Sequence, residues 1–206
     1  MVEFVLVQHG EKERTAGDPG LTPAGVRQAE RVAAFLAREH RAGVRIDRII
    51  ASPLRRTRET AMALAGALGL PVSLDSRLRE RMNWGDGAPG QSLAAFLQEW
   101  ARATQERDFV PSSGESSRAA GARLRAALDD LALTYPGQRL VIVTHGGVTV
   151  DLLRTLFGDD AVRRGHLEVL TQGVPAGAIT RLRRLGGEYV PLEIASVAHL
   201  PSRRRG

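Results

Sequence analysis

The sequence predicts an α/β fold, in which helices pack against a parallel or mixed sheet. Three apolar runs, at residues 2–7, 45–51 and 139–144, are each too short for a helix and too apolar for a strand that faces water. Segments with apolar residues at helical spacing lie between these runs. Buried strands that alternate with helices are typical of a layered α/β domain with right-handed crossovers.

Helix boundaries are predicted from capping residues as well as from apolar spacing. A helix should begin at Thr22-Pro23, a capping hydroxyl followed by proline, and end near Gly43. Ser112 and Glu115 have the spacing of a capping box, which predicts a helix that runs to about Tyr135. Apolar spacing predicts further helices at residues 53–68, 92–105 and 147–157.

The last third of the chain is predicted to change from helices to strands. Three segments separated by glycines are expected to be extended: residues 167–170, 178–185 and 188–194. The chain has 206 residues, enough for one domain with its own core, which we place at residues 1–198. Residues 199–206 then form a basic C-terminal tail, with Arg203-Arg204-Arg205 near its end.

Composition excludes several classes of function. The chain has no cysteine, which removes disulfides, thiolate nucleophiles and cysteine-ligated zinc. Its net charge is +6, but the arginines are scattered and aromatic residues make up only 4%, so we expect no nucleic-acid partner. The N-terminus resembles no signal peptide and no apolar run approaches 18 residues, so we expect a cytoplasmic protein without a membrane partner.

Two histidines share a context that favours chemistry. His9 and His145 each follow an apolar strand and precede a glycine, and the carboxyl ends of strands are where α/β sheets bind ligands. A third strand runs into Ser52-Pro53 and a predicted helix that carries Arg55, Arg56 and Arg58 in its first turns. Free N–H groups at a helix start, together with arginines, favour an anion such as phosphate.

These motifs, in this order, resemble the histidine phosphatase superfamily, also called phosphoglycerate-mutase-like. Its Arg-His-Gly signature resembles Gln8-His9-Gly10, its Leu-Thr-x-x-Gly-x-x-Gln-Ala segment matches residues 21–29, and its Ser-Pro-Leu segment is similar to residues 52–61. Gly114-Glu115-Ser116 and Val143-Thr144-His145-Gly146-Gly147 match two later motifs. The resemblance covers roughly residues 3 to 180 and implies a three-layer α/β/α sandwich with a mostly parallel central sheet.

The resemblance also implies roles for individual residues. His9 would be the nucleophile that forms a phosphohistidine, and Arg56 and His145 would hold the phosphoryl oxygens. Neither a metal nor a cofactor is implied. The leaving group needs an acid, and Glu80 lies in the segment that resembles the one carrying it. Asp86 and Glu11 are alternatives, because Gly85-Asp86-Gly87 stands where the family has Trp-Glu-Gly.

Gln8 departs from the family, which has arginine at this position. Glutamine has no charge and a shorter reach, so a charged clamp on the phosphate becomes a neutral hydrogen bond, with an expected loss of roughly tenfold to a thousandfold in rate. Lys12 or Arg14 could supply the missing charge. Alternatively, the pocket accepts a diester-like group or a phosphoramidate, or the protein binds phosphate without turnover.

The segment at residues 81–113 interrupts the α/β alternation and is expected to cover the substrate. Its apolar residues Met82, Trp84, Phe96 and Trp100 are candidates to line the site. The alternative is that Phe96 and Trp100, four residues apart, only pack a helix onto the core. The same segment holds Arg81, Arg102 and Arg107, few cations for a second phosphate, so we expect a hydrolase rather than a mutase. The expected partner is a phosphorylated metabolite or phosphoprotein. Nothing in the sequence indicates an oligomeric state.

Overall fold

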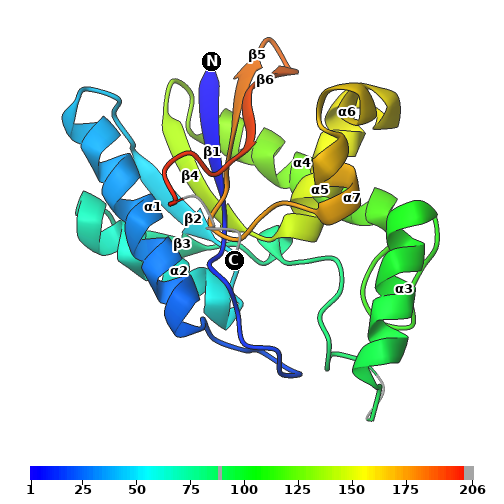
Figure 1. Ribbon diagram of the computed structural model, residues 1–206. Coiled ribbons are helices and arrows are strands. Elements are labelled where there is room, and N and C mark those ends of the chain that lie inside the picture. The colour runs from blue at the N-terminus through cyan, green and yellow to red at the C-terminus, as the bar shows by residue number, and fades with distance from the viewer. Residues whose placement is uncertain (88–89, 202–206) are drawn as a thin grey trace.

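A computed structural model describes residues 1–87 and 90–201. The described strands form one sheet of six, β1 (Val2–Gln8), β2 (Arg48–Ala51), β3 (Val72–Leu74), β4 (Arg139–Thr144), β5 (Ile179–Leu185) and β6 (Glu188–Ser196). Their order across the sheet is β3-β2-β4-β1-β5-β6 (Figure 1). β3, β2, β4 and β1 run parallel, and β5 pairs antiparallel with both β1 and β6. The predicted mostly parallel sheet is therefore confirmed.

Helices cover both faces of the sheet. α1 (Pro23–Arg41) and α2 (Arg55–Leu68) pack together on one face, and α4 (Ser117–Thr134) and α5 (Gly146–Phe157) pack together on the other (Figure 1). The connection from β3 to α4 contains the turn η1 (Ser76–Leu78) and the helix α3 (Leu93–Gln105), and α6 (Asp159–Gly165) and α7 (Leu167–Gln172) follow α5. This arrangement is the three-layer α/β/α sandwich that the resemblance implies.

Each face of the sheet has its own apolar core. Alternate residues of β1 point to opposite sides: Val5 and Val7 pack with Leu36 of α1, whereas Phe4 and Leu6 pack with Leu124 of α4. Both sets of β1 side chains are almost completely buried. This two-sided burial explains why the strands read as continuous apolar runs rather than as alternating ones.

Two predicted helix starts are confirmed by their capping contacts. Thr22 Oγ1 accepts the N–H of Gly25 at 3.0 Å, with Pro23 as the first residue of α1. Ser92 caps α3 in the same way, its Oγ accepting the N–H of Ala95 at 3.1 Å. Both contacts satisfy N–H groups that the first turn of a helix leaves free.

Two local predictions are wrong. Residues 167–170 form the helix α7 and not a strand, and only Val169 of α7 is buried. The predicted capping box of Ser112 and Glu115 is also absent, since Ser116 caps α4 by accepting the N–H of Ala119. The Ser112 hydroxyl instead donates to Glu99 at 2.7 Å, which joins the loop before α4 to α3.

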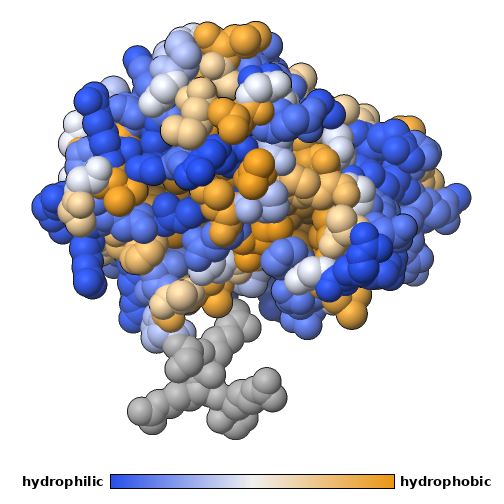
Figure 2. All heavy atoms as spheres, turned by 90° about the horizontal axis from the view of Figure 1, so that it is seen from above, coloured by the Kyte–Doolittle hydropathy of each residue, from blue (hydrophilic) through white to orange (hydrophobic). Residues whose placement is uncertain are grey.

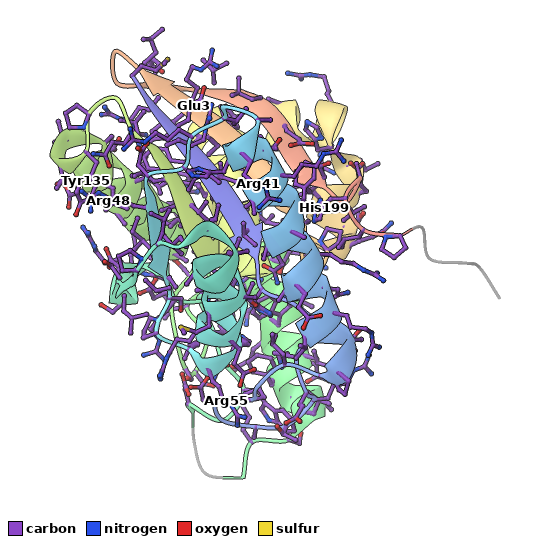
Figure 3. All side chains as sticks on the ribbon, turned by 90° about the vertical axis from the view of Figure 1, so that its left-hand side faces the viewer. Glu3, Arg41, Arg48, Arg55, Tyr135 and His199 are labelled. Carbon is purple, nitrogen blue, oxygen red and sulfur yellow. The ribbon has the colours of Figure 1, made fainter. Side chains whose placement is uncertain are left out.

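The C-terminal segment packs against the domain as far as it is described. His199 stacks on Phe35 of α1 with ring centroids 5.2 Å apart, and its Nε2 donates to the Gly177 carbonyl at 2.9 Å. Figure 3 shows His199 on the side of the molecule that α1 covers. Residues 202–206 of the expected tail, which include Arg203-Arg204-Arg205, lie outside the described residues.

Hydrophilic and hydrophobic residues both reach the surface. Figure 2 shows one face on which hydrophilic residues surround smaller groups of hydrophobic ones. Within the described residues, no helix combines the length and the apolar character needed to cross a membrane.

Candidate active site

The carboxyl ends of β1, β4 and β2 bring the candidate residues together. Gln8 pairs with Thr144 in the register of β1 and β4, so His9 and His145 are the next residues on adjacent parallel strands. Their rings lie 5.2 Å apart, centroid to centroid, with an edge-on angle of 68°. Ser52 follows β2 on the other side of β4, and its backbone N–H donates to the Val143 carbonyl at 3.0 Å. The topology thus places three separate sequence motifs within one pocket.

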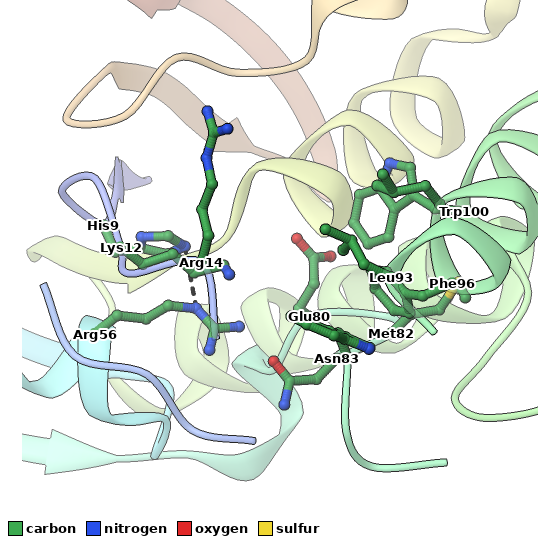
Figure 4. Close-up of a pocket in the computed structure, with 12 residues that line it drawn as sticks. His9, Lys12, Arg14, Arg56, Glu80, Met82, Asn83, Leu93, Phe96 and Trp100 are labelled. Atoms are coloured by element: carbon green, nitrogen blue, oxygen red, sulfur yellow. Dashed lines mark hydrogen bonds between the residues drawn. The ribbon is translucent and has the colours of Figure 1, made fainter. Parts of the chain in front are cut away.

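His9 is held as a neutral imidazole with a defined tautomer. Its Nδ1 lies 2.7 Å from the Gly10 carbonyl oxygen, which can only accept, so Nδ1 carries the proton. Nε2 is then unprotonated, and Arg56 Nε donates to it at 3.3 Å (Figure 4). Burial, together with the charge of Arg56, lowers the pKa of His9 to about 3. Nε2 therefore carries an unprotonated electron pair at neutral pH, which accepts from Arg56 in this structure.

Backbone packing fixes the turn that follows His9. A Cβ atom on Gly10 would collide with the Gly25 carbonyl, and one on Gly25 would collide with the Glu11 carbonyl. The Gly10 N–H also donates to Thr60 Oγ1 of α2 at 3.2 Å. Two glycines of different motifs therefore let the His9 turn lie directly on the start of α1.

His145 is completely buried at the start of α5. Its Nε2 lies 2.8 Å from the Ser52 hydroxyl, while Nδ1 has no hydrogen-bond partner among the described residues. Burial and the charge of Arg56 lower the pKa of His145 well below its ordinary value, so its ring is also neutral at neutral pH.

Arg56 is the arginine of α2 that faces the site. It is 2% exposed, whereas Arg55 points outward and pairs with Glu59 at 2.7 Å. Arg56 Nη1 has no hydrogen-bond partner within the described part of the chain and lies 3.8 Å from the Asp18 carboxylate. Asp18 also accepts the N–H of Arg55 at 2.8 Å, at the start of α2.

Gln8 lies beside His9 at the end of β1. Its Nε2 is 3.4 Å from His9 Nε2, so the amide can donate only a long hydrogen bond to the ring. Its Oε1 is buried and has no partner among the described residues. Three of the residues that surround His9, namely Gln8, Arg56 and His145, therefore each hold an unpartnered buried polar atom. Such atoms are rare in folded proteins, and they indicate the binding place of a polar ligand.

Glu80 lies at the start of α5, across the pocket from Arg56 (Figure 4). Its carboxylate accepts the N–H groups of Gly147 at 2.9 Å and Val148 at 2.7 Å, and that of Arg81 at 2.9 Å. These contacts use the free N–H groups of the first helical turn to hold the carboxylate. A Cβ on Gly147 would come within 2.6 Å of the Trp100 ring and 2.7 Å of the Glu80 carboxylate, so a larger residue there would displace these side chains.

The two alternative carboxylates lie elsewhere. Asp86 pairs with Arg79 at 3.1 Å and accepts from Asn83 at 3.1 Å, and it lines a different cavity. Glu11 is exposed and accepts from the Thr22 hydroxyl at 3.2 Å. Neither lines the two cavities that contain His9, whereas Glu80 lines both.

Two cavities meet at His9. The first, of about 360 Å³, is lined by His9, Arg56, Lys12 and Arg14, and on its far side by residues of the 81–113 segment. The second, of about 710 Å³, touches Gln8, His9 and Lys12 and extends between α3, α5 and α7. Lys12 is thus common to both, and its pKa is lowered by burial and by the charges of Arg56 and Arg14. The described residues hold no group of three or more histidine and carboxylate side chains placed to bind a metal ion.

Sequence reasoning assigned no role to three residues that contact the site. Ser52 holds His145, Thr60 holds the turn at Gly10, and Asp18 lies beside Arg56. Ser52 and Thr60 belong to the segment that resembles the Ser-Pro-Leu motif, so the sequence did contain a signal for their place near the site. Asp18 lies in an irregular loop, and no motif of the sequence marked it as a site residue.

Comparisons with known proteins agree with the fold and with the motifs. The model of the histidine phosphatase superfamily (branch 1) matches residues 4–193. A probable phosphoglycerate mutase of Yersinia enterocolitica is 38% identical over 170 residues, which cover 77% of this chain and 76% of that protein. A corresponding protein of Yersinia pestis is 37% identical with the same coverage.

Solved structures share the fold. The mycobacterial glucosyl-3-phosphoglycerate phosphatase in complex with inorganic phosphate has a TM-score of 0.73 and 24% identity, over 97% of this chain and 99% of that one. A phosphoserine phosphatase mutant from Entamoeba histolytica, in complex with phosphoserine, also has a TM-score of 0.73, with 21% identity over 98% of this chain and 100% of that one.

Proposed function

Because this chain belongs to the histidine phosphatase superfamily, we propose that it hydrolyses phosphomonoesters through a phosphohistidine formed on His9. One observation carries the proposal. His9 is a buried, neutral imidazole whose unprotonated Nε2 faces Arg56, among unpartnered polar atoms of Gln8, Arg56 and His145. This arrangement supplies a nucleophile and places for the oxygens of a phosphoryl group.

In the first step, His9 Nε2 attacks phosphorus while the bond between phosphorus and the ester oxygen breaks. Glu80, in its protonated form, donates a proton to the departing alkoxide. The contact of Nδ1–H with the Gly10 carbonyl stabilises the positive charge that develops on the imidazole ring.

In the second step, water attacks the phosphohistidine. The Glu80 carboxylate takes a proton from that water while the bond between Nε2 and phosphorus breaks, which releases inorganic phosphate and restores neutral His9. Arg56 and His145 hold the phosphoryl oxygens in both steps. The nucleophile, the acid and the charge all come from side chains, so we propose a metal-independent reaction.

The charge missing at Gln8 is supplied in this proposal by Lys12, with a smaller contribution from Arg14. Lys12 lies in the turn directly after His9, is partly buried and lines both cavities. Arg14 lines the first cavity but is exposed. The Gln8 amide retains a neutral hydrogen bond to the site.

Hydrolysis is favoured over phosphoryl transfer between two positions of a substrate. A second phosphate would need free cations in the 81–113 segment, but Arg102 pairs with Glu106 at 3.1 Å and Arg107 pairs with Asp159 at 3.3 Å. Arg81 is buried against Asp151 at 2.9 Å. The substrate in this proposal is a small phosphorylated metabolite or a phosphoprotein, and the 81–113 segment covers it.

The test is steady-state hydrolysis of p-nitrophenyl phosphate in metal-free buffer by the native chain, His9→Ala and Gln8→Arg. Turnover by the native chain and its loss in His9→Ala are expected, and full activity of His9→Ala would overturn the role of His9. If only Gln8→Arg turns over, the native chain is a phosphate-binding protein with an intact scaffold. Interconversion of phosphoglycerate isomers by the native chain, without net release of phosphate, would instead indicate the mutase activity that the names of its Yersinia relatives suggest.

A further inference from the structure

We propose that the substrate's ester group is apolar, as in an alkyl or aryl phosphate, and not a phosphorylated sugar acid or amino acid. This inference rests on the proposed function, since it concerns the same site. It is carried by the first cavity, in which the residues that would hold the phosphoryl group face a wall of apolar side chains.

The direction of the ester group follows from the chemistry of the first step. The leaving oxygen departs from the side of phosphorus opposite the attacking nitrogen, and the acid must lie within reach of it. In Figure 4, His9 and Arg56 lie on one side, Glu80 in the middle, and Met82, Phe96 and Trp100 beyond it. An ester group that leaves past Glu80 therefore enters this apolar part. The second cavity is lined by His9 and Glu80 but not by Arg56, so it lacks the arginine that would hold the phosphoryl oxygens.

The apolar wall is one face of the helix α3. Leu93, Phe96, Leu97 and Trp100 lie at helical spacings of three and four, and all four line the cavity. Such a face normally packs into a protein core, but the only buried residue of α3 is Ala103. Leu93 stays 42% exposed and Leu97 52% exposed. An apolar ester group would remove this surface from water.

Among the residues that the structure describes, the far end of the cavity has no cation to receive a carboxylate. Lys12, Arg14 and Arg56 are the cations among its described lining residues, and all three belong to the end near His9. The polar side-chain groups of the described residues at that end are the amide of Asn83 and the indole N–H groups of Trp84 and Trp100. The Asn83 amide already donates to the Gly17 carbonyl at 2.6 Å and to Asp86 at 3.1 Å, and the Trp84 N–H donates to the Gln91 carbonyl at 3.0 Å. A carboxylate placed there would lose its hydration without gaining a counter-charge.

Arg81 supports the apolar wall through Trp100, but its charge is not available to a substrate in the cavity. Its guanidinium lies 4.1 Å from the centroid of the Trp100 ring and donates to the Asp151 carboxylate at 2.9 and 3.0 Å. Asp151 also accepts from the Ser117 hydroxyl of α4 at 2.5 Å. Trp100 is thus braced by a buried ion pair, and the positive charge behind it is already neutralised.

The experiment measures kcat/KM for n-butyl, n-hexyl and n-octyl phosphate, whose leaving alcohols are almost equally acidic, so that only apolar contact changes. We expect a rise of about two- to fourfold per methylene until the cavity is filled. A hexyl phosphate with a terminal carboxylate should be at least about 100-fold worse than hexyl phosphate. A flat series, or preference for the carboxylated ester, would overturn the inference.

Two matched variants assign the effect to the wall. Leu97→Arg should flatten the alkyl series and improve the carboxylated ester, because it adds a cation at an exposed position of the cavity. Leu133→Arg introduces the same side chain at a position of α4 that is 75% exposed and outside both cavities, and should change neither. Equal effects of the two variants would also overturn the inference.

Binding of butyl-, hexyl- and octylphosphonate, measured by calorimetry against inorganic phosphate, separates this inference from the proposed function. These compounds are not hydrolysed, so their affinity should rise with chain length whether or not the protein turns over. Tightening without hydrolysis of any ester would overturn the proposed hydrolase and support the apolar site. Hydrolysis whose rate does not change with chain length, together with phosphonate affinities that do not change with chain length, would support the hydrolase and overturn the apolar site.

Discussion

Replacing Lys12 by methionine tests whether this residue supplies the charge that Gln8 lacks. Lys12 follows His9 by three residues and lines both cavities that meet there. Its charge already acts on the site, because it helps to lower the pKa of His9. Methionine retains most of the length and the apolar stem of the side chain but removes the ammonium group.

The expected loss follows from one charge-assisted hydrogen bond to a phosphoryl oxygen. Such a bond contributes about 1.5–3 kcal/mol, which corresponds to a fall of roughly 10- to 150-fold in kcat/KM. Arg14→Met is the matched control, because Arg14 is exposed and its charge is screened by water. Exposed ion pairs contribute at most about 1 kcal/mol, so this control should lose less than about fivefold.

The assay is hydrolysis of p-nitrophenyl phosphate by each variant and by Lys12→Met combined with Gln8→Arg. If Lys12 compensates for Gln8, the added arginine should restore most of the activity of Lys12→Met while changing the native chain little. The second cavity beside Gln8 leaves space for the longer side chain. Full activity of Lys12→Met would refute the compensation, and a large gain from Gln8→Arg alone would show that the native site is impaired.

Three further predictions concern the acid, the buried histidines and the buried ion pair. Glu80→Gln should slow hydrolysis of alkyl phosphates by about 100-fold or more. It should slow hydrolysis of p-nitrophenyl phosphate much less, because nitrophenolate leaves without a proton. Equal losses in the two assays would argue against Glu80 as the acid. Since burial holds the pKa of His9 at about 3 and that of His145 well below its ordinary value, the unfolded chain binds more protons than the native one below about pH 6.5. The free energy of unfolding, measured in urea, should therefore decrease as the pH is lowered, by up to about 1.4 kcal/mol per pH unit for each histidine. Equal free energies of unfolding at about pH 7 and 5 would contradict this. Arg81→Met should lower the free energy of unfolding by about 3–5 kcal/mol at neutral pH, because it leaves Asp151 buried without a counter-charge. In the native chain burial raises the pKa of Asp151 to about 6. Protonation of Asp151 in acid should therefore make the loss of stability in Arg81→Met smaller. A loss below about 1 kcal/mol at neutral pH would contradict the role of the pair.

The sheet and the two histidines were predictable because buried parallel strands leave a strong local signal. Residues 139–144 form β4 with the predicted bounds, and His145 follows directly. A strand buried on both faces is apolar throughout, so its end is visible in the sequence wherever a polar residue and glycine follow.

The wrong predictions arise where a short segment fits two structures equally well. The apolar residues 167–170 are too few to separate the period of a strand from that of a helix. Glu115 was expected to complete a capping box, but its carboxylate binds Arg123 at 3.0 Å, and Ser116 caps the helix instead. The contact with Arg123, eight residues further along the chain, occupies this carboxylate, and the local capping pattern does not contain that information.

The contacts of Glu80 and Arg81 also depend on the tertiary structure. The sequence shows only two adjacent charged residues, whose side chains turn to different places: Glu80 to the start of α5 and Arg81 to buried Asp151. These partners are about 70 residues further along the chain. The apolar face of α3 was visible as a helical pattern, but whether it faced the core or a cavity required the structure.

The most direct test of the phosphohistidine on His9 is to trap it. The native chain would be mixed with p-nitrophenyl phosphate, quenched in alkali within milliseconds, digested and mapped by mass spectrometry, with His9→Ala as the control. The proposed mechanism predicts an acid-labile phosphoryl group on His9 in the native chain and none in the variant. Turnover of the ester by the native chain with no phosphoryl group on His9, or with one on another residue, would contradict it.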